Sequence, residues 1–300
     1  MSENTNHLRY IETQIRLGNY HDALESCSKA LGVLNDIKLE DKKPTTYKQP
    51  WLLKALGHKD IESVNTQRND SLILEKFKTK IFESLCLFYL HKTEAGVKKL
   101  DNTFNEIEKI KNQLYPNYKE DLIKFIDKIN EEIQELYLLS NYVNTSRNKQ
   151  KNENENINIK KYLNLSEDEL YIKIGDLITK EVRDSSKILN SRILLLKSNN
   201  SILLPQSSDI KNDKLVESHT FGKKLTSALK KSLYNILCNP KDRVGKKYVT
   251  VDSIKTLVSG ALISIGLKYN AVITPFAALI LMFGIETYCE MSKPKEINNT

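Results

Sequence analysis

The strongest constraint on the fold is a seam of large apolar side chains that recurs every three or four residues. The seam is clearest after Pro116, where its positions alternate in steps of four and three: Leu122, Ile126, Ile129, Ile133 and Leu136. This spacing places all five side chains on one face of an α-helix. Such a helix needs a second helix against its apolar face, and the preceding helix folded back on it is the nearest candidate.

The composition extends this expectation to the whole chain. Only 10 of the 300 residues are glycine and 7 are proline, whereas Leu, Ile, Lys, Glu and Asn are abundant. That balance favours helices over a sandwich or barrel of many short strands. We therefore predict an all-α protein, with enough apolar residues, 40% of the chain, to bury one large core or two ordinary ones.

A polar stretch divides the chain into two predicted domains. Residues 141–161 are rich in Asn, Lys and Glu and have almost no apolar periodicity, which is typical of a flexible linker. We predict a domain of helical hairpins over residues 1–140 and a smaller helical domain over residues 162–300. In the second domain, Ser166 to Glu169 form a capping box, and the helix that follows is expected to run to about Lys197.

The first hairpin is expected over residues 7–34, as two short helices joined by a turn near Gly18. The turn and the helix after it contain Gly18, Tyr20, Ala23 and Ala30. This pattern resembles the middle of a tetratricopeptide repeat, a helical hairpin whose copies stack into a concave peptide-binding groove. Tyr10 would correspond to the large aromatic of the first helix, whereas the proline that closes the second helix in that family is absent.

A second and weaker copy of the hairpin spans residues 72–114, with its turn near Leu90. Between the copies, Asp36 to Asp70 contains the only tryptophan and two prolines, and we expect an irregular insertion there. The resemblance implies a module that binds another protein. The residues expected on the contact surface are Tyr10, Gln14, Tyr20 and His21. An aromatic side chain at Tyr20 can equally serve to pack the turn.

Positive charge is concentrated in one window of the second domain. The net charge of the chain is +8, and residues 223–247 hold eight basic residues against one acidic, a balance of +7. The basic residues are Lys223, Lys224, Lys230, Lys231, Lys241, Arg243, Lys246 and Lys247. A local basic patch points to an anionic partner, either a membrane surface or a nucleic acid. Because the window has few aromatic residues, a nucleic acid would be bound through its backbone.

The last part of the chain is unusually apolar, with Lys268 as the only charged residue from Leu257 to Ile285. One interpretation is a soluble pair of core helices, the first ending at Gly266 and the second starting at Thr274, where threonine can cap. Each helix would then have about a dozen apolar residues, fewer than the roughly 20 that a membrane span requires.

The competing interpretation is a membrane-associated effector in which residues 257–285 insert into a bilayer and residues 249–290 provide the membrane contact. Two-part architectures of this sort occur in bacterial defence and toxin proteins, and the comparison is an analogy of architecture alone. Lys268 favours the soluble helix pair, because a charge within hydrocarbon costs about 3 kcal/mol. In that case the lysines of the basic window form a solvated helix face.

The residues that usually carry chemistry do not combine into a catalytic pattern. The glycines near the C-terminus fit no phosphate-binding loop, and the five histidines have no partner at metal-ligand spacing. The four cysteines form no Cys-x-x-Cys pair: Cys27, Cys86, Cys238 and Cys289. We therefore predict a non-enzymatic protein without a cofactor or metal site. The polar N-terminus predicts a cytoplasmic chain with reduced thiols, which would be membrane-associated only under the competing interpretation.

Overall fold

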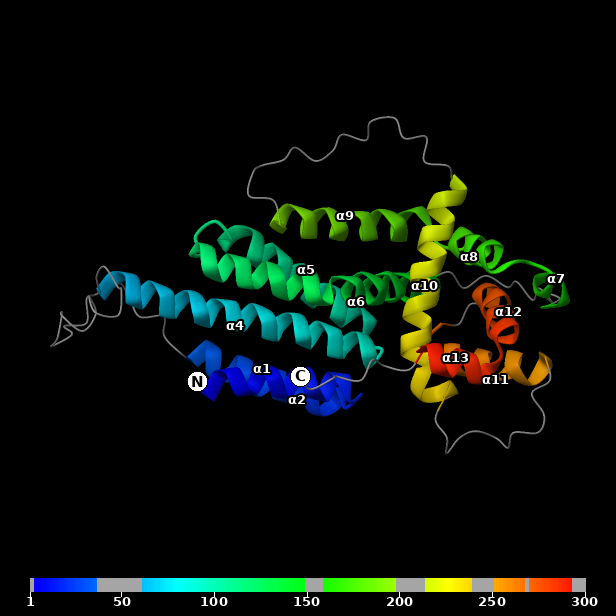
Figure 1. The fold of residues 1–300 in the computed structure, drawn as a ribbon, viewed down its shortest axis with the longest axis horizontal. Coiled ribbons are helices and arrows are strands. Elements are labelled where there is room, and N and C mark those ends of the chain that lie inside the picture. The colour runs from blue at the N-terminus through cyan, green and yellow to red at the C-terminus, as the bar shows by residue number, and fades with distance from the viewer. Residues whose placement is uncertain are drawn as a thin grey trace. The chain divides into compact units, whose positions relative to one another are not determined.

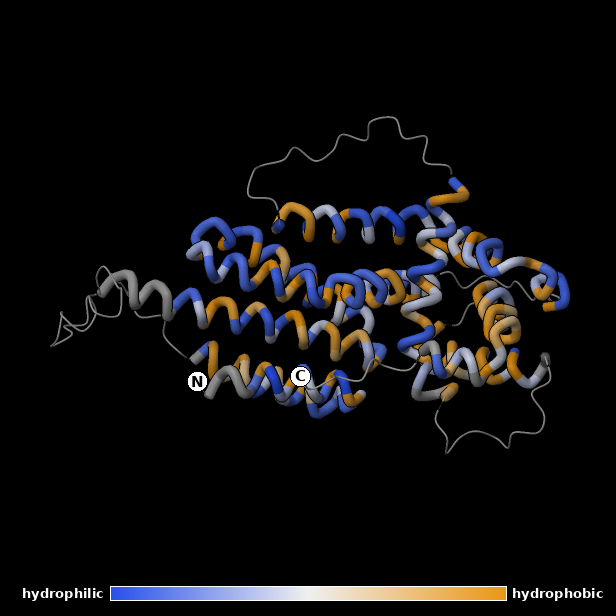
Figure 2. Tube along the Cα trace, in the orientation of Figure 1, coloured by the Kyte–Doolittle hydropathy of each residue, from blue (hydrophilic) through white to orange (hydrophobic). Residues whose placement is uncertain are grey.

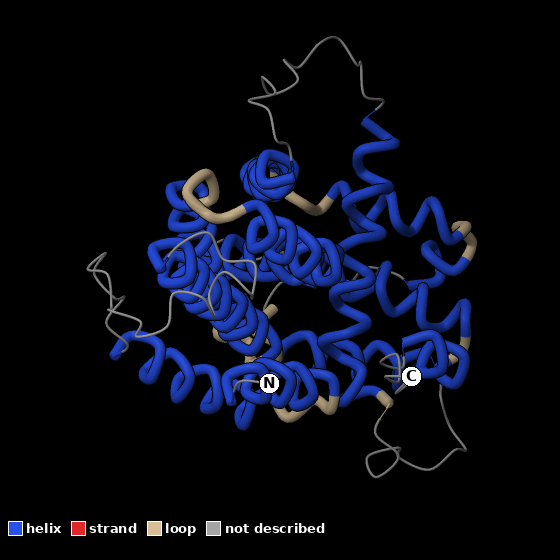
Figure 3. The backbone as a smooth tube through the Cα atoms, turned by 60° about the vertical axis from the view of Figure 1, so that its left-hand side comes forward, coloured by secondary structure: helices blue, strands red, loops and turns tan. Residues whose placement is uncertain are grey.

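The computed structural model describes residues 3–36, 61–148, 159–197, 214–238, 251–267 and 270–292. Every regular element within those ranges is a helix, which confirms the all-α prediction (Figures 1 and 3). The chain forms two compact units. Unit 1 comprises Met1–Leu90 and Lys98–Asn130, and unit 2 comprises His91–Val97 and Glu131–Thr300.

Unit 1 is built from two helical hairpins. Its helices are α1 (Glu3–Arg16), α2 (Tyr20–Asp36), α4 (Ile61–Tyr89), most of α5 (Thr93–Ile110) and the first half of α6 (Pro116–Asn148). The helices α1, α2 and α4 lie side by side (Figure 1). The two helices predicted over residues 7–34 are present, with their turn at Gly18. All five seam residues of α6 are buried, none with more than 2% of its surface exposed.

The second hairpin begins earlier than the sequence suggests. The expected insertion from Asp36 to Asp70 is wrong in its last ten residues, because α4 already starts at Ile61. Asp70 is buried within α4, where its carboxylate accepts a hydrogen bond of 2.8 Å from the backbone N–H of Tyr115. The acid therefore satisfies a donor in the turn between α5 and α6. Residues 37–60 of the expected insertion, with Trp51, lie outside the described residues.

Unit 2 gathers shorter helices around α10. In addition to the end of α6 it contains α7 (Ile159–Leu163), α8 (Glu167–Asp176), α9 (Lys180–Lys197), α10 (Lys214–Leu237), α11 (Val251–Ser264), the 3₁₀ turn η1 (Asn270–Val272), α12 (Ile273–Phe283) and α13 (Ile285–Ser292). The predicted linker over residues 141–161 is helical at both ends. Tyr142 and Val143 are buried in α6, and α7 begins at Ile159. Residues 149–158 lie outside the described residues.

The capping box at the start of α8 is confirmed. The hydroxyl of Ser166 accepts from the backbone N–H of Glu169 at 3.3 Å, and the carboxylate of Glu169 accepts from the backbone N–H of Ser166 at 2.7 Å. The single helix predicted to run on to Lys197 is wrong, because it stops at Asp176 and restarts at Lys180. Arg183 lies beside the break. Its guanidinium donates to the carbonyl oxygens of Gly175 at 2.8 Å and of Ile178 at 3.2 Å.

The C-terminal apolar segment lies in the core of unit 2. Eight successive residues of α12, Ile273–Ile280, are buried, and Figure 2 shows this helix as strongly hydrophobic. The helix starts one residue earlier than predicted, so Thr274 is a buried helical residue and the expected threonine cap is wrong. The first helix of the pair ends as predicted before Gly266, which adopts a φ of 91°. Among the described helices none is both long and apolar enough to cross a membrane.

The closest approach of two helices in unit 2 is the crossing of α8 and α10. A Cβ atom built on Gly175 would lie 1.8 Å from the carbonyl oxygen of Ser218, and one on Gly222 would lie 1.8 Å from the carbonyl oxygen of Tyr171. The two backbones are therefore in direct contact, and each helix needs a glycine where it meets the other. No side chain can be accommodated at either position without moving the helices apart.

We expect Gly222→Ala to lower the free energy of unfolding by about 2 kcal/mol or more, because the added methyl group forces the helices apart. Gly260→Ala is the matched control. Gly260 is also a helical glycine of unit 2, but a Cβ there meets no atom within 4 Å. Alanine should stabilise that exposed helix position by up to about 1 kcal/mol. Urea unfolding followed by circular dichroism measures both effects, and equal stabilities of the two variants would contradict the backbone contact.

Candidate protein-binding surface

The turn between α1 and α2 has a well-defined hydrogen-bond pattern. The N–H of Gly18 donates to the carbonyl of Ile15 at 3.1 Å, and the N–H of Asn19 donates to the carbonyl of Gln14 at 2.9 Å. These two bonds form a Schellman motif, which requires a left-handed residue at the helix end. Gly18 provides it with a φ of 79°. The amide of Asn19 also donates to the side-chain oxygen of Gln14 at 2.8 Å, so the turn holds the end of α1 in place.

Small side chains on one face of α2 allow close packing within unit 1. Ala23, Cys27 and Ala30 are buried at steps of four and three. The thiol of Cys27 makes a hydrogen bond with the thiol of Cys86 on α4, and this contact, together with burial, raises the pKa of Cys27 well above its usual range. Both thiols are free and fully buried. The two cysteines therefore act as small core residues, and Cys27 keeps its proton.

The opposite side of α1 carries an exposed stripe. Ile11 and Ile15 face the core, whereas a second set of side chains at steps of three and four lies on the surface. We call this set the α1 stripe, and it consists of His7, Tyr10, Gln14 and Leu17. Tyr10 is 49% exposed and Leu17 is 66% exposed. The α1 stripe therefore presents one aromatic and one aliphatic side chain to solvent, with the partly buried amide of Gln14 between them.

The structure places the four residues predicted to contact a partner in different surroundings. Tyr10 and Gln14 belong to the α1 stripe, and His21 is exposed at the start of α2. Tyr20 instead stacks on Tyr89 of α4, with ring centroids 4.3 Å apart and ring planes nearly parallel. It packs the turn against the second hairpin, as the alternative interpretation had it. Leu17 was not among the predicted residues, although its position one helical step beyond Gln14 could have indicated it.

The basic window of α10 is not a free cationic surface. The amine of Lys224 donates to the side-chain oxygen of Gln134 at 2.8 Å. The amine of Lys231 pairs with Glu135 at 2.6 Å, and only 4% of that glutamate side chain is exposed. Burial lowers the pKa of Lys224. These lysines connect α10 to α6. The expectation of a solvated lysine face is wrong for the partly buried Lys224, whereas Lys231 remains exposed while it pairs with Glu135.

The remaining basic residues have different surroundings. The amine of Lys230 lies over two aromatic rings, 5.3 Å from the centroid of Phe283 and 5.9 Å from that of Tyr288. Burial lowers the pKa of Lys230 as well. Lys223 is exposed. The other four basic residues of the predicted patch lie outside the described residues: Lys241, Arg243, Lys246 and Lys247.

A polar network at the α8–α10 crossing was not predicted from the sequence. The hydroxyl of Ser218 donates to the carboxylate of Asp176 at 2.7 Å and accepts from the guanidinium of Arg183 at 3.2 Å. Arg183 also pairs with Glu217 at 3.4 Å, and Glu217 pairs with Lys187 at 2.5 Å. The network joins residues that are up to 42 positions apart, so no local pattern could reveal it. It satisfies the polar groups that the glycine contact buries.

The described histidine contacts do not form a catalytic arrangement. His219 pairs with Asp168 at 2.9 Å, but 80% of that aspartate side chain is exposed. The neighbouring Ser218 is fully buried and is engaged by Asp176 and Arg183, so His219 does not activate it. Within the described ranges there is also no group of three or more His, Cys, Asp or Glu side chains that could hold a metal ion.

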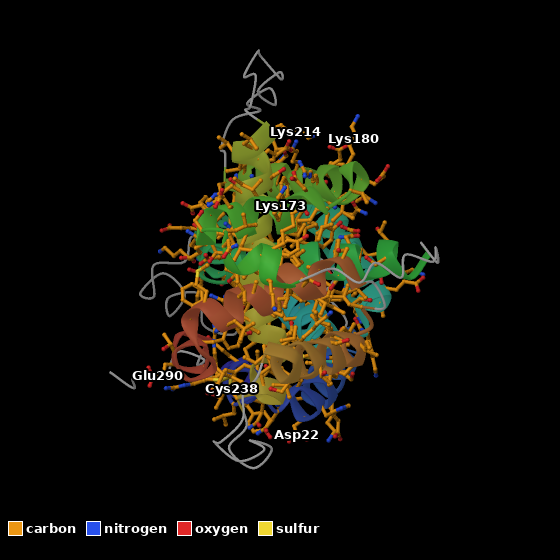
Figure 4. All side chains as sticks on the ribbon, turned by 90° about the vertical axis from the view of Figure 1, so that its right-hand side faces the viewer. Asp22, Lys173, Lys180, Lys214, Cys238 and Glu290 are labelled. Carbon is orange, nitrogen blue, oxygen red and sulfur yellow. A yellow bond between two sulfur atoms is a disulfide. The ribbon has the colours of Figure 1, made fainter. Side chains whose placement is uncertain are left out.

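One pair of cysteines differs from the expectation of reduced thiols. Cys238 at the end of α10 and Cys289 in α13 form a disulfide, with their Cα atoms 5.5 Å apart (Figure 4, which labels Cys238). The prediction that all four thiols are reduced is therefore wrong for this pair and holds for Cys27 and Cys86. The sequence did not indicate this pairing, because the two cysteines are 51 positions apart and belong to different parts of the fold.

The comparison with known proteins gives no relative from which a function could be transferred. No family model, curated protein or solved structure matches the chain.

We expect Lys231→Met to lower the free energy of unfolding by about 3 kcal/mol, because it leaves the buried carboxylate of Glu135 without its ion-pair partner. This loss of stability is at the lower end of the range for broken buried ion pairs, because the positive charge of Lys224 also acts on Glu135. Lys223→Met on the exposed face of the same helix should change the stability by less than about 0.5 kcal/mol. Equal effects in chemical denaturation would mean that the Lys231 contact is not structural.

The Glu217 carboxylate should make the stability of unit 2 depend on pH. Its hydrogen bond with Lys187, with a smaller contribution from Arg183, lowers the pKa of Glu217. A lowered pKa in the folded state stabilises the protein above the pKa of the unfolded state, and this contribution is lost as the pH falls through the folded value. Wild type should therefore be more stable than Glu217→Gln at about pH 7, and the difference should shrink towards about pH 3. A difference that stays constant in urea unfolding across this range would contradict the assignment.

Proposed function

We propose that the chain is a non-enzymatic binding protein whose α1 stripe contacts a partner protein. The observation that carries the proposal is the exposure of Tyr10 and Leu17 on one face of α1, opposite the buried Ile11 and Ile15. Single exposed apolar residues are common on protein surfaces. Two of them flanking an amide at helical spacing form a continuous surface, and tyrosine in particular is enriched in the contacts between proteins.

The surroundings of the α1 stripe suit the rim of such a contact. On another face of the same helix, Glu12 pairs with Lys128 at 2.5 Å and with Arg16 at 4.0 Å, and the exposed Arg9 precedes Tyr10. The centre of the α1 stripe carries no charge, because Tyr10, Gln14 and Leu17 are uncharged. A charged rim around an uncharged centre is the usual composition of a protein interface.

The spacing of the α1 stripe indicates what the partner must provide. Tyr10 and Leu17 are seven residues apart, which places them about 10 Å apart along α1. A partner helix or extended segment would need two apolar side chains at a similar distance and a polar group near Gln14. This form of contact agrees with the peptide-binding role that the resemblance to tetratricopeptide hairpins implies.

Three observations make the other candidate functions less well supported. The residues of α12 that an inserting segment would use are buried. Lysines that a nucleic acid or membrane would need are engaged by Gln134, Glu135 and two aromatic rings. The described polar clusters of unit 2 bind one another and do not converge on an open site. Protein binding by the α1 stripe therefore remains the proposed function.

The test compares two double variants of the full-length protein. Tyr10→Ala with Leu17→Ala removes the two apolar ends of the α1 stripe. Ile188→Ala with Leu194→Ala is the matched control, since these residues of α9 are 61% and 54% exposed. Each protein carries the same affinity tag, and the proteins retained from a lysate of the source cells are quantified by mass spectrometry.

We expect at least one protein that wild type and the α9 variant retain equally, and that the α1 variant retains at least about tenfold less. Loss of two interface side chains of this size commonly costs more than 1.4 kcal/mol, which is tenfold in affinity. Because all four side chains are exposed, circular dichroism should show the same folding for both variants. A set of retained proteins that is identical for the three baits would refute the proposal.

A further inference from the structure

The last described helix, α13, is held by few side chains. It has eight residues, and a helix of that length is not stable by itself in water. Two of its side chains are buried, Tyr288 and Cys289, whereas Thr287 and Glu290 are exposed. Ile285 at the start of α13 is partly buried against the same core. The attachment of α13 to unit 2 therefore depends on what Tyr288 and Cys289 contact, together with the packing of Ile285.

Tyr288 connects α13 to both α12 and α10. Its ring meets the ring of Phe276 edge to face, with 6.3 Å between the centroids. The amine of Lys230 lies 5.9 Å from the centroid of Tyr288 and also contacts Phe283 at the end of α12. Phe276 is fully buried under this arrangement. Tyr288 thus covers part of the most apolar helix of the unit.

Cys289 provides the only covalent connection, through its disulfide to Cys238 at the end of α10. The bond closes a loop of 51 residues that includes α11 and α12. A covalent bond that closes a loop of this length lowers the conformational entropy of the state in which α13 is detached from the unit. Without the bond, α13 would be held mainly by Tyr288 and the partly buried Ile285, and helices with so few buried contacts open locally more often than the core does.

We propose that the Cys238–Cys289 disulfide is a reversible latch, which holds α13 over α12 when oxidised and releases it when reduced by a dithiol. In the opening step a thiolate of the dithiol attacks one sulfur and forms a mixed disulfide. The second thiol of the reductant then displaces the remaining cysteine. Two electrons pass to the protein, the two protons come from the dithiol, and the dithiol leaves as a disulfide.

Opening the latch changes the surface of unit 2 in a defined way. The departure of Tyr288 exposes the ring of Phe276 and the neighbouring apolar residues of α12, which the closed form buries. It also removes one of the two rings that lie against the amine of Lys230. The open form therefore presents an apolar surface beside a cation. The latch concerns unit 2 alone, so its test is independent of the α1 stripe.

The other two cysteines give an internal reference for the redox state. Cys27 and Cys86 are free, so the native protein should contain two thiols and one disulfide. Denaturing the purified protein without reductant and labelling it with iodoacetamide should modify two cysteines, and prior reduction should raise this number to four. Labelling of all four cysteines without reduction, in protein purified without added reductant, would overturn the proposal.

Hydrogen–deuterium exchange then tests whether the bond holds α13. We compare the oxidised protein with the protein reduced by tris(2-carboxyethyl)phosphine or dithiothreitol, and with the variant Cys238→Ser, Cys289→Ser. Amides of α13 should exchange at least about tenfold faster after reduction and in the variant, whereas those of α4 should not change. Reductant should have no further effect on the variant.

Equal protection of α13 in the oxidised and reduced proteins would overturn the latch. The same conclusion would follow if reduction accelerated exchange throughout unit 2 to the same extent, because the bond would then stabilise the whole unit and release no single helix. If the serine variant fails to fold, the comparison of the oxidised and reduced wild-type proteins still decides between these outcomes. Reoxidation must restore the slow exchange, since a latch has to close again.

Discussion

The direct contact between the backbones of α8 and α10 determines the arrangement of unit 2. Two glycines, Gly175 and Gly222, allow the helices to touch, and each lies against a carbonyl oxygen of the other helix. Contact at this distance buries polar groups of both backbones, which must then be satisfied from nearby. Arg183 does so by donating to the carbonyl of Gly175 and to the hydroxyl of Ser218. The same guanidinium also binds the carbonyl of Ile178 at the helix break before α9.

The position of α10 in turn decides what its lysines do. A run of basic residues in a sequence suggests a charged surface, but a lysine side chain is a long apolar stem with one charged end. On α10 the stems pack within the unit, and the amines reach an amide, a buried carboxylate and two aromatic rings. Net charge counted over a sequence window therefore overestimates the charge that a partner can meet. The described part of the window offers two exposed lysines, Lys223 and Lys231, where the sequence suggested four, and Lys231 is already paired with Glu135.

Periodicity was sufficient to predict most helices, because the burial of a helix face depends on spacing alone. It placed α2 and α6 and the seam that starts at Leu122. It failed where side-chain contacts accompany a change in the local pattern, as at the break before α9, where the guanidinium of Arg183 binds the carbonyls of Gly175 and Ile178. Thr274 is a similar case. Its type and the proline after it suggest a helix start, but burial of the apolar residues around it extends the helix by one residue.

The candidate binding surface was predicted in part for the same reason. Tyr10 and Gln14 share a helix face, so their place on the same side of α1 could be expected from their spacing. Tyr20 could not be assigned, because its stacking partner Tyr89 belongs to the other hairpin, 69 positions along the chain. The disulfide could not be predicted either, since Cys238 follows α10, Cys289 lies in α13, and the two cysteines form no sequence motif.

The burial of all four cysteines has a practical consequence for spectroscopy. Two form the disulfide and the other two are enclosed between α2 and α4, and none exposes more than 5% of its surface. In the oxidised folded protein no native thiol should react with a maleimide dye or spin label. A single cysteine introduced at an exposed position, for example in place of Lys29, can then carry a reporter group without removal of the natural cysteines.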